Sequence, residues 1–194
     1  MNKLRSLLSA ALAVVVLASC SDDGNLENRL DKVEDALGTN EPLKVDFSTK
    51  NNNDIDIVNK RTYLFKPGGD SEYIYDNGDG TFYVYIERFS DVEWYEGAWI
   101  EFMYDEEANE VTEREAGTYF YNHFGNWESA RFDDDYTANT INIDVNSFNS
   151  ETGKISVNVT ASSEVGYEQN RYEGKPMNMT LSFRGKLPVF LNND

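Results

Sequence analysis

The chain has 194 residues, and its 35 acidic side chains outnumber the 17 basic ones, which gives a formal net charge of −18 at pH 7. So much negative charge is repelled by phosphate backbones, which argues against a nucleic-acid-binding protein. Aromatic residues make up 13% of the chain, a bias that favours pleated, half-buried strands.

The first nineteen residues predict an export signal. Lys3 and Arg5 form a short basic segment, and residues 7–17 are an apolar run interrupted only by Ser9. This run is too short for a transmembrane helix, which needs about 20 apolar residues, but it has the length and flanks of a signal-peptide core. The alternative is an N-terminal core helix that buries the cysteine following it.

The apolar run ends in Leu17-Ala18-Ser19-Cys20, which resembles a bacterial lipobox. The resemblance implies that residues 1–19 are removed and that the thiol of Cys20 carries a lipid that anchors the protein to a membrane. Cys20 is the single cysteine, so no intramolecular disulfide forms. Removing residues 1–19 takes away two basic residues and leaves 15 basic and 35 acidic ones, a net charge of −20.

Ser21, Asp22 and Asp23 follow the cysteine and resemble the export signal of Bacteroides-type surface lipoproteins. The resemblance implies a protein on the outer face of the outer membrane, exposed at the cell surface. An acidic tether that faces the periplasm is the alternative.

Residues 20–42 predict a tether that contains a short amphipathic helix. Leu26, Leu30, Val33 and Leu37 are spaced by four, three and four residues, as in a coiled-coil seam. The segment spans fewer than two heptads, and a helix that short is marginal in water. Whether it oligomerises or is a loose spacer stays open.

From Leu43 onwards the apolar period changes to two, which predicts one β domain over residues 43–194. Each strand has one apolar and one polar face, so antiparallel sheets with one wet side are expected. We predict an all-β fold, a two-sheet antiparallel β-sandwich, with a closed β-barrel as the alternative. About nine or ten strands are expected, in the segments 43–47, 55–65, 73–75, 81–89, 99–104, 110–113, 117–124, 141–145, 155–159 and 177–191.

Three local features refine this pattern. Asn77-Gly78 between aromatic strands predicts a hairpin with a type I′ turn. Gly185 predicts a bulge inside one long last strand, since Leu187 and Val189 continue its apolar face. The ending Gly-Lys-Leu-Pro-Val-Phe resembles the closing strand of small lipoprotein β-sandwich domains of unknown function in Bacteroides-type bacteria.

Catalytic and metal-binding residues are not assigned. His123 is the one histidine and sits in an aromatic segment, where a packed or surface role is expected. Asp76 and Asp79 are weak candidates for calcium ligands, but a hairpin turn accounts for them. The run of residues 133–135, three aspartates, is expected in a solvated loop. No cofactor is expected.

Aromatic residues in polar, loop-like segments are the candidate ligand-binding residues: Trp94, Tyr95, Trp127 and Tyr136. Such rings stack on sugar faces or anchor protein interfaces, and the alternative is that they cover the ends of the core. We therefore expect a non-catalytic binding module, which binds a glycan or acts beside an outer-membrane uptake complex. The alternatives are a structural lipoprotein that binds another protein and a glycan hydrolase that uses two carboxylates.

Overall fold

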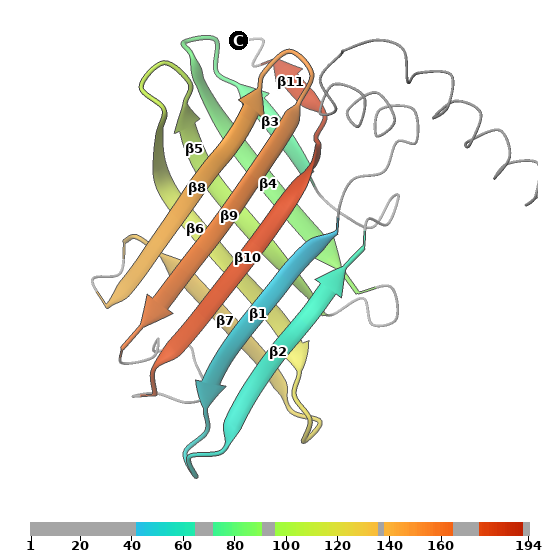
Figure 1. Cartoon of the computed structure of the whole chain (residues 1–194), viewed down its shortest axis with the longest axis vertical. Coiled ribbons are helices and arrows are strands. Elements are labelled where there is room, and N and C mark those ends of the chain that lie inside the picture. Colours follow the sequence, from blue (N-terminus) through green and yellow to red (C-terminus); the bar gives the residue numbers. More distant parts are fainter. Residues whose placement is uncertain (1–41, 65–71, 91–95, 136–137, 165–174, 192–194) are drawn as a thin grey trace, which may run out of the picture. The chain divides into compact units, whose positions relative to one another are not determined.

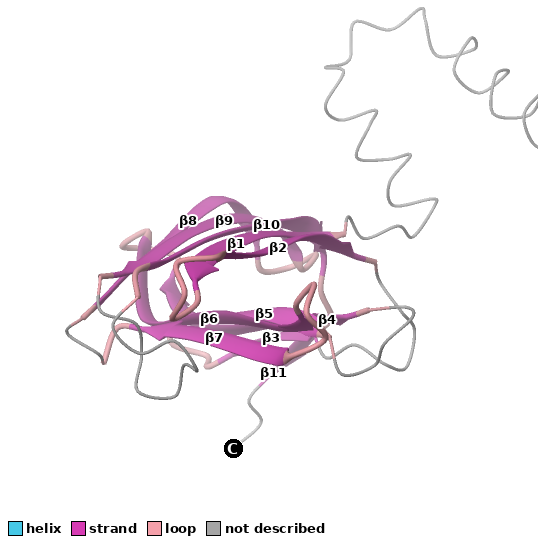
Figure 2. Ribbon diagram, turned by 90° about the horizontal axis from the view of Figure 1, so that it is seen from below, coloured by secondary structure: helices cyan, strands magenta, loops and turns pink. Residues whose placement is uncertain are grey.

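The computed structural model describes residues 42–64, 72–90, 96–135, 138–164 and 175–191. All of them fall within one unit of the chain, Asn40–Asp194. In these ranges the chain forms eleven strands in two sheets that lie face to face, and the strands of one sheet cross those of the other (Figures 1 and 2). The predicted all-β sandwich is confirmed. Because each sheet is made of different strands, the barrel alternative is wrong.

The two sheets differ in size. The five-stranded sheet has the order β2 (Asp56–Tyr63), β1 (Leu43–Lys50), β10 (Met177–Lys186), β9 (Lys154–Ser163) and β8 (Asn139–Asn149). The six-stranded sheet has the order β11 (Val189–Leu191), β3 (Glu72–Asp76), β4 (Thr81–Phe89), β5 (Gly97–Asp105), β6 (Glu110–Tyr121) and β7 (Trp127–Asp133).

Alternation of side chains places the core between the sheets. In β4 the residues Phe82, Val84 and Ile86 are buried while their neighbours point outwards, because successive side chains of a strand face opposite ways. Phe47 of β1 meets Phe120 of β6 edge to face across the core, with ring centroids 5.7 Å apart. Burial of these apolar side chains is the main force that holds the sheets together.

The last strand differs from the prediction. Gly185 pairs in register with Ile155, so no bulge occurs there, and β10 ends at Lys186. The chain then leaves the five-stranded sheet, and β11 pairs in parallel with β3 of the other sheet. Pro188 lies at this crossing, where it cannot donate a ladder hydrogen bond, and its carbonyl accepts one from the Ile74 N–H at 2.9 Å. The expectation of purely antiparallel sheets is wrong at this one pair of strands.

The strands β6 and β7 also differ from the prediction. The two segments expected at 110–113 and 117–124 form one strand, bent by a bulge where Glu113 has a φ of 51°. Residues 127–133 were expected in a loop and instead form β7. Apolar and polar residues alternate only weakly in this segment, because the charged residue Glu128 occupies a buried position and is 5% exposed.

The predicted hairpin at residues 76–80 is present, but its turn is longer than a type I′ turn. Positive φ angles occur at Gly78 and Gly80. The Asp76 carboxylate accepts the Gly78 N–H at 2.8 Å, and that of Asp79 accepts the N–H and the hydroxyl of Thr81 at 3.0 and 2.6 Å. Both carboxylates therefore serve the turn itself.

Candidate functional site

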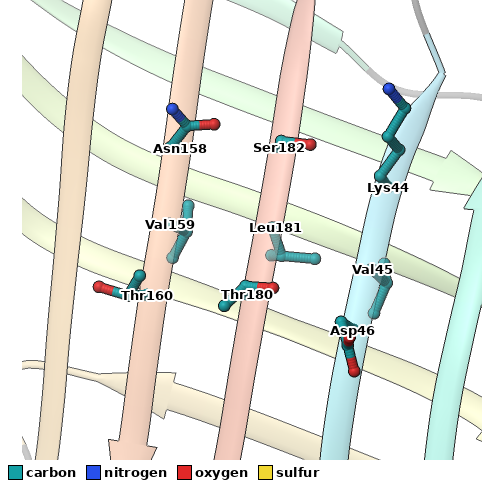
Figure 3. A pocket seen from close by; sticks show the side chains of 9 residues that line it. All are labelled: Lys44, Val45, Asp46, Asn158, Val159, Thr160, Thr180, Leu181 and Ser182. Atoms are coloured by element: carbon teal, nitrogen blue, oxygen red, sulfur yellow. The ribbon is translucent and has the colours of Figure 1, made fainter.

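The outer face of the five-stranded sheet carries polar and charged side chains. On β1, β10 and β9 they form a regular grid around a shallow hollow, shown in Figure 3. This is the ordinary composition of a sheet face that is exposed to solvent, so it does not point to a binding site. The outward side chains of the grid are Lys44, Asp46, Asn158, Thr160, Thr180 and Ser182.

The outer face of the six-stranded sheet is different, because it carries ten aromatic side chains from all six strands. Each occupies an outward position of its strand, and the residues between them, such as Ile74, Val84 and Phe120, point into the core. We call this set the aromatic face. Its members are Tyr73, Tyr75, Tyr83, Tyr85, Phe89, Trp99, Tyr119, Tyr121, Trp127 and Phe190.

Two glycines seat the central rings of this face. Gly117 is the cross-strand partner of Trp99, and a Cβ at Gly117 would lie 2.1 Å from the indole. Gly97 is the partner of Tyr119, and a Cβ there would lie 2.8 Å from the phenol oxygen. The two rings lean over the glycine backbones with centroids 5.7 Å apart and planes inclined by 30°. A ring that leans over the sheet in this way turns one of its faces towards solvent.

A second group of rings lies on β3, β4 and β11. The centroid of Tyr73 lies 4.8 Å from that of Tyr75, 5.9 Å from that of Tyr83 and 5.5 Å from that of Tyr85. Phe190 extends the group to the edge of the sheet, 5.6 Å from Tyr75. These separations fall in the range at which aromatic pairs attract each other.

Carboxylates stand between the rings and accept their polar hydrogens. Glu101 accepts the hydroxyl of Tyr83 at 2.7 Å, and Glu87 accepts that of Tyr119 at 2.9 Å. Glu115 accepts the indole N–H of Trp99 at 3.0 Å. The acids therefore hold the orientation of the rings as well as giving the face its charge.

Arg131 completes the arrangement at one side. Its guanidinium lies 2.6 Å from one carboxylate oxygen of Glu115 and 3.3 Å from Asp133. The second oxygen of Glu115 is the one that holds Trp99. Glu115 is thus fully engaged in positioning an indole and an arginine.

The environment shifts the titration of these groups. Burial raises the pKa of the Tyr83 hydroxyl above its ordinary value, and the acceptor Glu101 raises it further. Burial and Glu87 act on the pKa values of Tyr85 and Tyr119 in the same direction. Burial also raises the pKa of Glu115, against the opposing effects of Trp99 and Arg131. The phenols therefore stay protonated and remain donors to the carboxylates.

Of the four aromatic residues predicted to bind a ligand, Trp127 lies in the described residues. It is the first residue of β7 rather than a loop residue, it is 49% exposed, and it faces Tyr121 across the strands. The structure therefore places it at one edge of the aromatic face. Trp94, Tyr95 and Tyr136 lie outside the described residues, as do Cys20 and the acidic segment 21–23.

The other members of the aromatic face were not singled out from the sequence. A signal for part of the set was present, because Phe82, Val84 and Ile86 share one face of their strand and so Tyr83 and Tyr85 must share the other. That these two tyrosines share a sheet face with Trp99 and with residues of β6 depends on strand order and register. The alternation of apolar residues within one strand does not predict either.

The remaining candidates have local roles. His123 is exposed in the turn between β6 and β7, with its ring 3.8 Å from that of Phe124. Asp133 ends β7 and caps the Asp135 N–H at 3.1 Å, and Asp134 lies 3.4 Å from the guanidinium of Arg114. Within the described ranges, no group of three or more His, Cys, Asp or Glu side chains is arranged to hold a metal ion. No helix there is long and apolar enough to cross a membrane.

Comparisons with protein-family models, with curated proteins and with solved structures gave no match. The argument for function therefore rests on the chemistry of the aromatic face and on the N-terminal sequence.

Proposed function

We propose that this protein is a lipid-anchored, non-catalytic binding protein of the outer-membrane surface and that its aromatic face binds a glycan. The observation that carries the proposal is the contrast between the two outer faces. The outer face of the five-stranded sheet is solvated and carries polar and charged side chains, so the fold itself does not require ten aromatic rings on the six-stranded sheet. Four of these rings are exposed and the other six are half-buried, and contiguous aromatic surface of this kind is typical of binding sites.

The chemistry of the face suits sugars. The leaning rings of Trp99 and Tyr119 offer flat apolar surfaces to the C–H faces of pyranose rings. Glu101 uses one carboxylate oxygen to accept the Tyr83 hydroxyl, and a carboxylate has further lone pairs for sugar hydroxyls. Stacking and hydroxyl acceptance are thus combined on one surface.

Substitution at the centre of the face tests the proposal. Trp99→Ala removes the ring that leans over Gly117, and we expect it to lower glycan affinity at least about tenfold in an array and titration screen on residues 21–194. Val58→Ala, at an exposed position of the opposite sheet, is the control and should leave binding unchanged. Failure of the unsubstituted protein to bind any glycan would refute the proposal.

A protein partner is the second candidate, because one edge of the aromatic face is exposed and apolar. Tyr75, Phe190 and Leu191 are 42%, 48% and 66% exposed around the short edge strand β11. Aromatic anchors of this kind are common at interfaces. A partner cross-linked on intact cells and lost in Leu191→Asp, together with no glycan binding, would favour this function.

The membrane anchor is supported by the lipobox-like residues before Cys20 and by the acidic segment after it. Cells fed a radioactive fatty acid are expected to label the protein, and Cys20→Ala should abolish the label. Replacement of Asp22 and Asp23 by alanine should keep the label but remove the protein from the protease-accessible cell surface.

A further inference from the structure

The aromatic face crosses the whole sheet. Phe190 lies on β11, which is one edge strand, and Trp127 lies on β7, which is the other. Neighbouring strands are about 4.8 Å apart, so crossing the six strands takes at least about 24 Å. The row of rings is longer than this because it slants, with Phe190 level with Tyr83 and Trp127 level with a position beyond Phe89. A path of this length accommodates several sugar units laid across the strands, whereas a single terminal sugar would occupy only a small part of it.

The face is built as a surface and not as a pocket. Its rings pack against one another and over the backbones of Gly97 and Gly117. Two hollows in the described residues lie elsewhere, one on the outer face of the five-stranded sheet and one along the seam between β6 and β8. A chain end is held by walls that enclose it, whereas an open row of rings is suited to the middle of a chain.

The charge of the face selects against acidic ligands. Glu87, Glu101 and Glu115 lie on three adjacent strands, and Glu101 and Glu115 are direct cross-strand neighbours. The nearby cation, Arg131, is already paired with Glu115 and Asp133. A carboxylate or sulfate on an approaching glycan would meet these acids first and be repelled.

From extent, shape and charge together, we infer that the ligand is a linear, uncharged polysaccharide, held along several consecutive sugar units across the six-stranded sheet. The inference rests on the proposed glycan binding and narrows it. It predicts that affinity depends on chain length, since a longer chain reaches more rings. Rings at the two edges then matter for long chains more than for short ones.

The test uses residues 21–194 and defined oligosaccharides. Neutral series of one to six units, β-1,4-linked glucose, mannose and xylose and α-1,4-linked glucose, are titrated by calorimetry beside an oligogalacturonate series of the same lengths. For at least one neutral series we expect the hexamer to bind roughly ten times more tightly than the dimer. Phe190→Ala and Trp127→Ala, matched in exposure at opposite edges, should each weaken the hexamer more than the dimer.

The outcomes separate this inference from the proposed function. Equal affinity for monomer and hexamer, or tighter binding of the oligogalacturonates, would overturn the inference and leave glycan binding standing. Edge variants that weaken all chain lengths equally would also overturn it. No binding in any neutral or acidic series would instead count against the proposed function itself.

Discussion

At the scale of single residues, hydrogen bonds between phenols and carboxylates hold the aromatic face in order. Tyr83 donates to Glu101, and Tyr119 donates to Glu87. A charge-assisted bond of this type is about twice as strong as a neutral one. The arrangement depends on the phenol proton, because an ionised tyrosine beside a carboxylate would place two negative charges in contact.

This dependence predicts alkaline instability. The pKa values of Tyr83 and Tyr119 are raised in the folded protein, whereas in the unfolded chain both ionise near pH 10. Above that pH the folded state holds more protons than the unfolded state, so the free energy of unfolding should fall as pH rises. Urea titrations from pH 8 to pH 11 should show this fall. In Tyr83→Phe/Tyr119→Phe its slope should be smaller, and an unchanged slope would contradict the argument.

At the scale of elements, the hairpin between β8 and β9 supports the chain where it crosses from one sheet to the other. Gly153, with a φ of 72°, accepts a hydrogen bond from the Leu187 N–H at 2.9 Å. A Cβ at Gly153 would lie 2.0 Å from the Leu187 carbonyl oxygen, which is backbone and has little room to move. This close approach fixes the position from which β11 starts.

We therefore predict that Gly153→Ala destabilises the domain by about 1–3 kcal/mol beyond the cost of its positive φ. The matched control is Gly125→Ala, since Gly125 has a φ of 74° but nothing within 4 Å of its Cβ position. Chemical denaturation compares the two variants. Hydrogen exchange at Val189 and Phe190 should accelerate in Gly153→Ala alone. Equal costs in both variants would show that the approach to Leu187 is unimportant.

How far the strands could be predicted depends on how regularly apolar and polar residues alternate along them. Strands with strict alternation, such as residues 155–159, were located because one face is apolar throughout. β7 was missed because Glu128 is buried with its carboxylate 2.6 Å from the amide nitrogen of Asn122, a contact that the pattern hides. β11 was read as a continuation of β10 because a change of sheet leaves the period of two intact. The aromatic face depends on strand order and register, so of its ten members only Trp127 was singled out from the sequence.

At the scale of the whole molecule, an ion pair joins the two sheets beside the apolar core. Arg61 of β2 pairs with Glu96, which lies just before β5 and is 4% exposed. The second oxygen of Glu96 accepts the Tyr121 N–H at 2.8 Å. The pair therefore links the edge of the five-stranded sheet to two strands of the other.

Removing one partner should be costly, because it leaves a buried charge. We predict that Arg61→Met lowers the free energy of unfolding by roughly 3 kcal/mol and that adding Glu96→Gln recovers most of the loss. Urea denaturation of the two single variants and the double variant gives the coupling. If Arg61→Met were nearly neutral, the pair would contribute no more than an ordinary surface contact.

The pairing of β1 with β10 determines when, during synthesis, the five-stranded sheet can be completed. β1 is the first strand to be synthesised, yet the partner on its open side is completed almost at the end of the chain. Until then β1 and β2 form a two-stranded hairpin, which is marginal on its own in water. The five-stranded sheet therefore cannot be completed until its last strands emerge from the ribosome. Under the export that we propose, in which the chain passes through a membrane N-terminus first, that delay would keep the β1–β2 hairpin unpaired with β10 during passage and leave completion of the sheet to the far side.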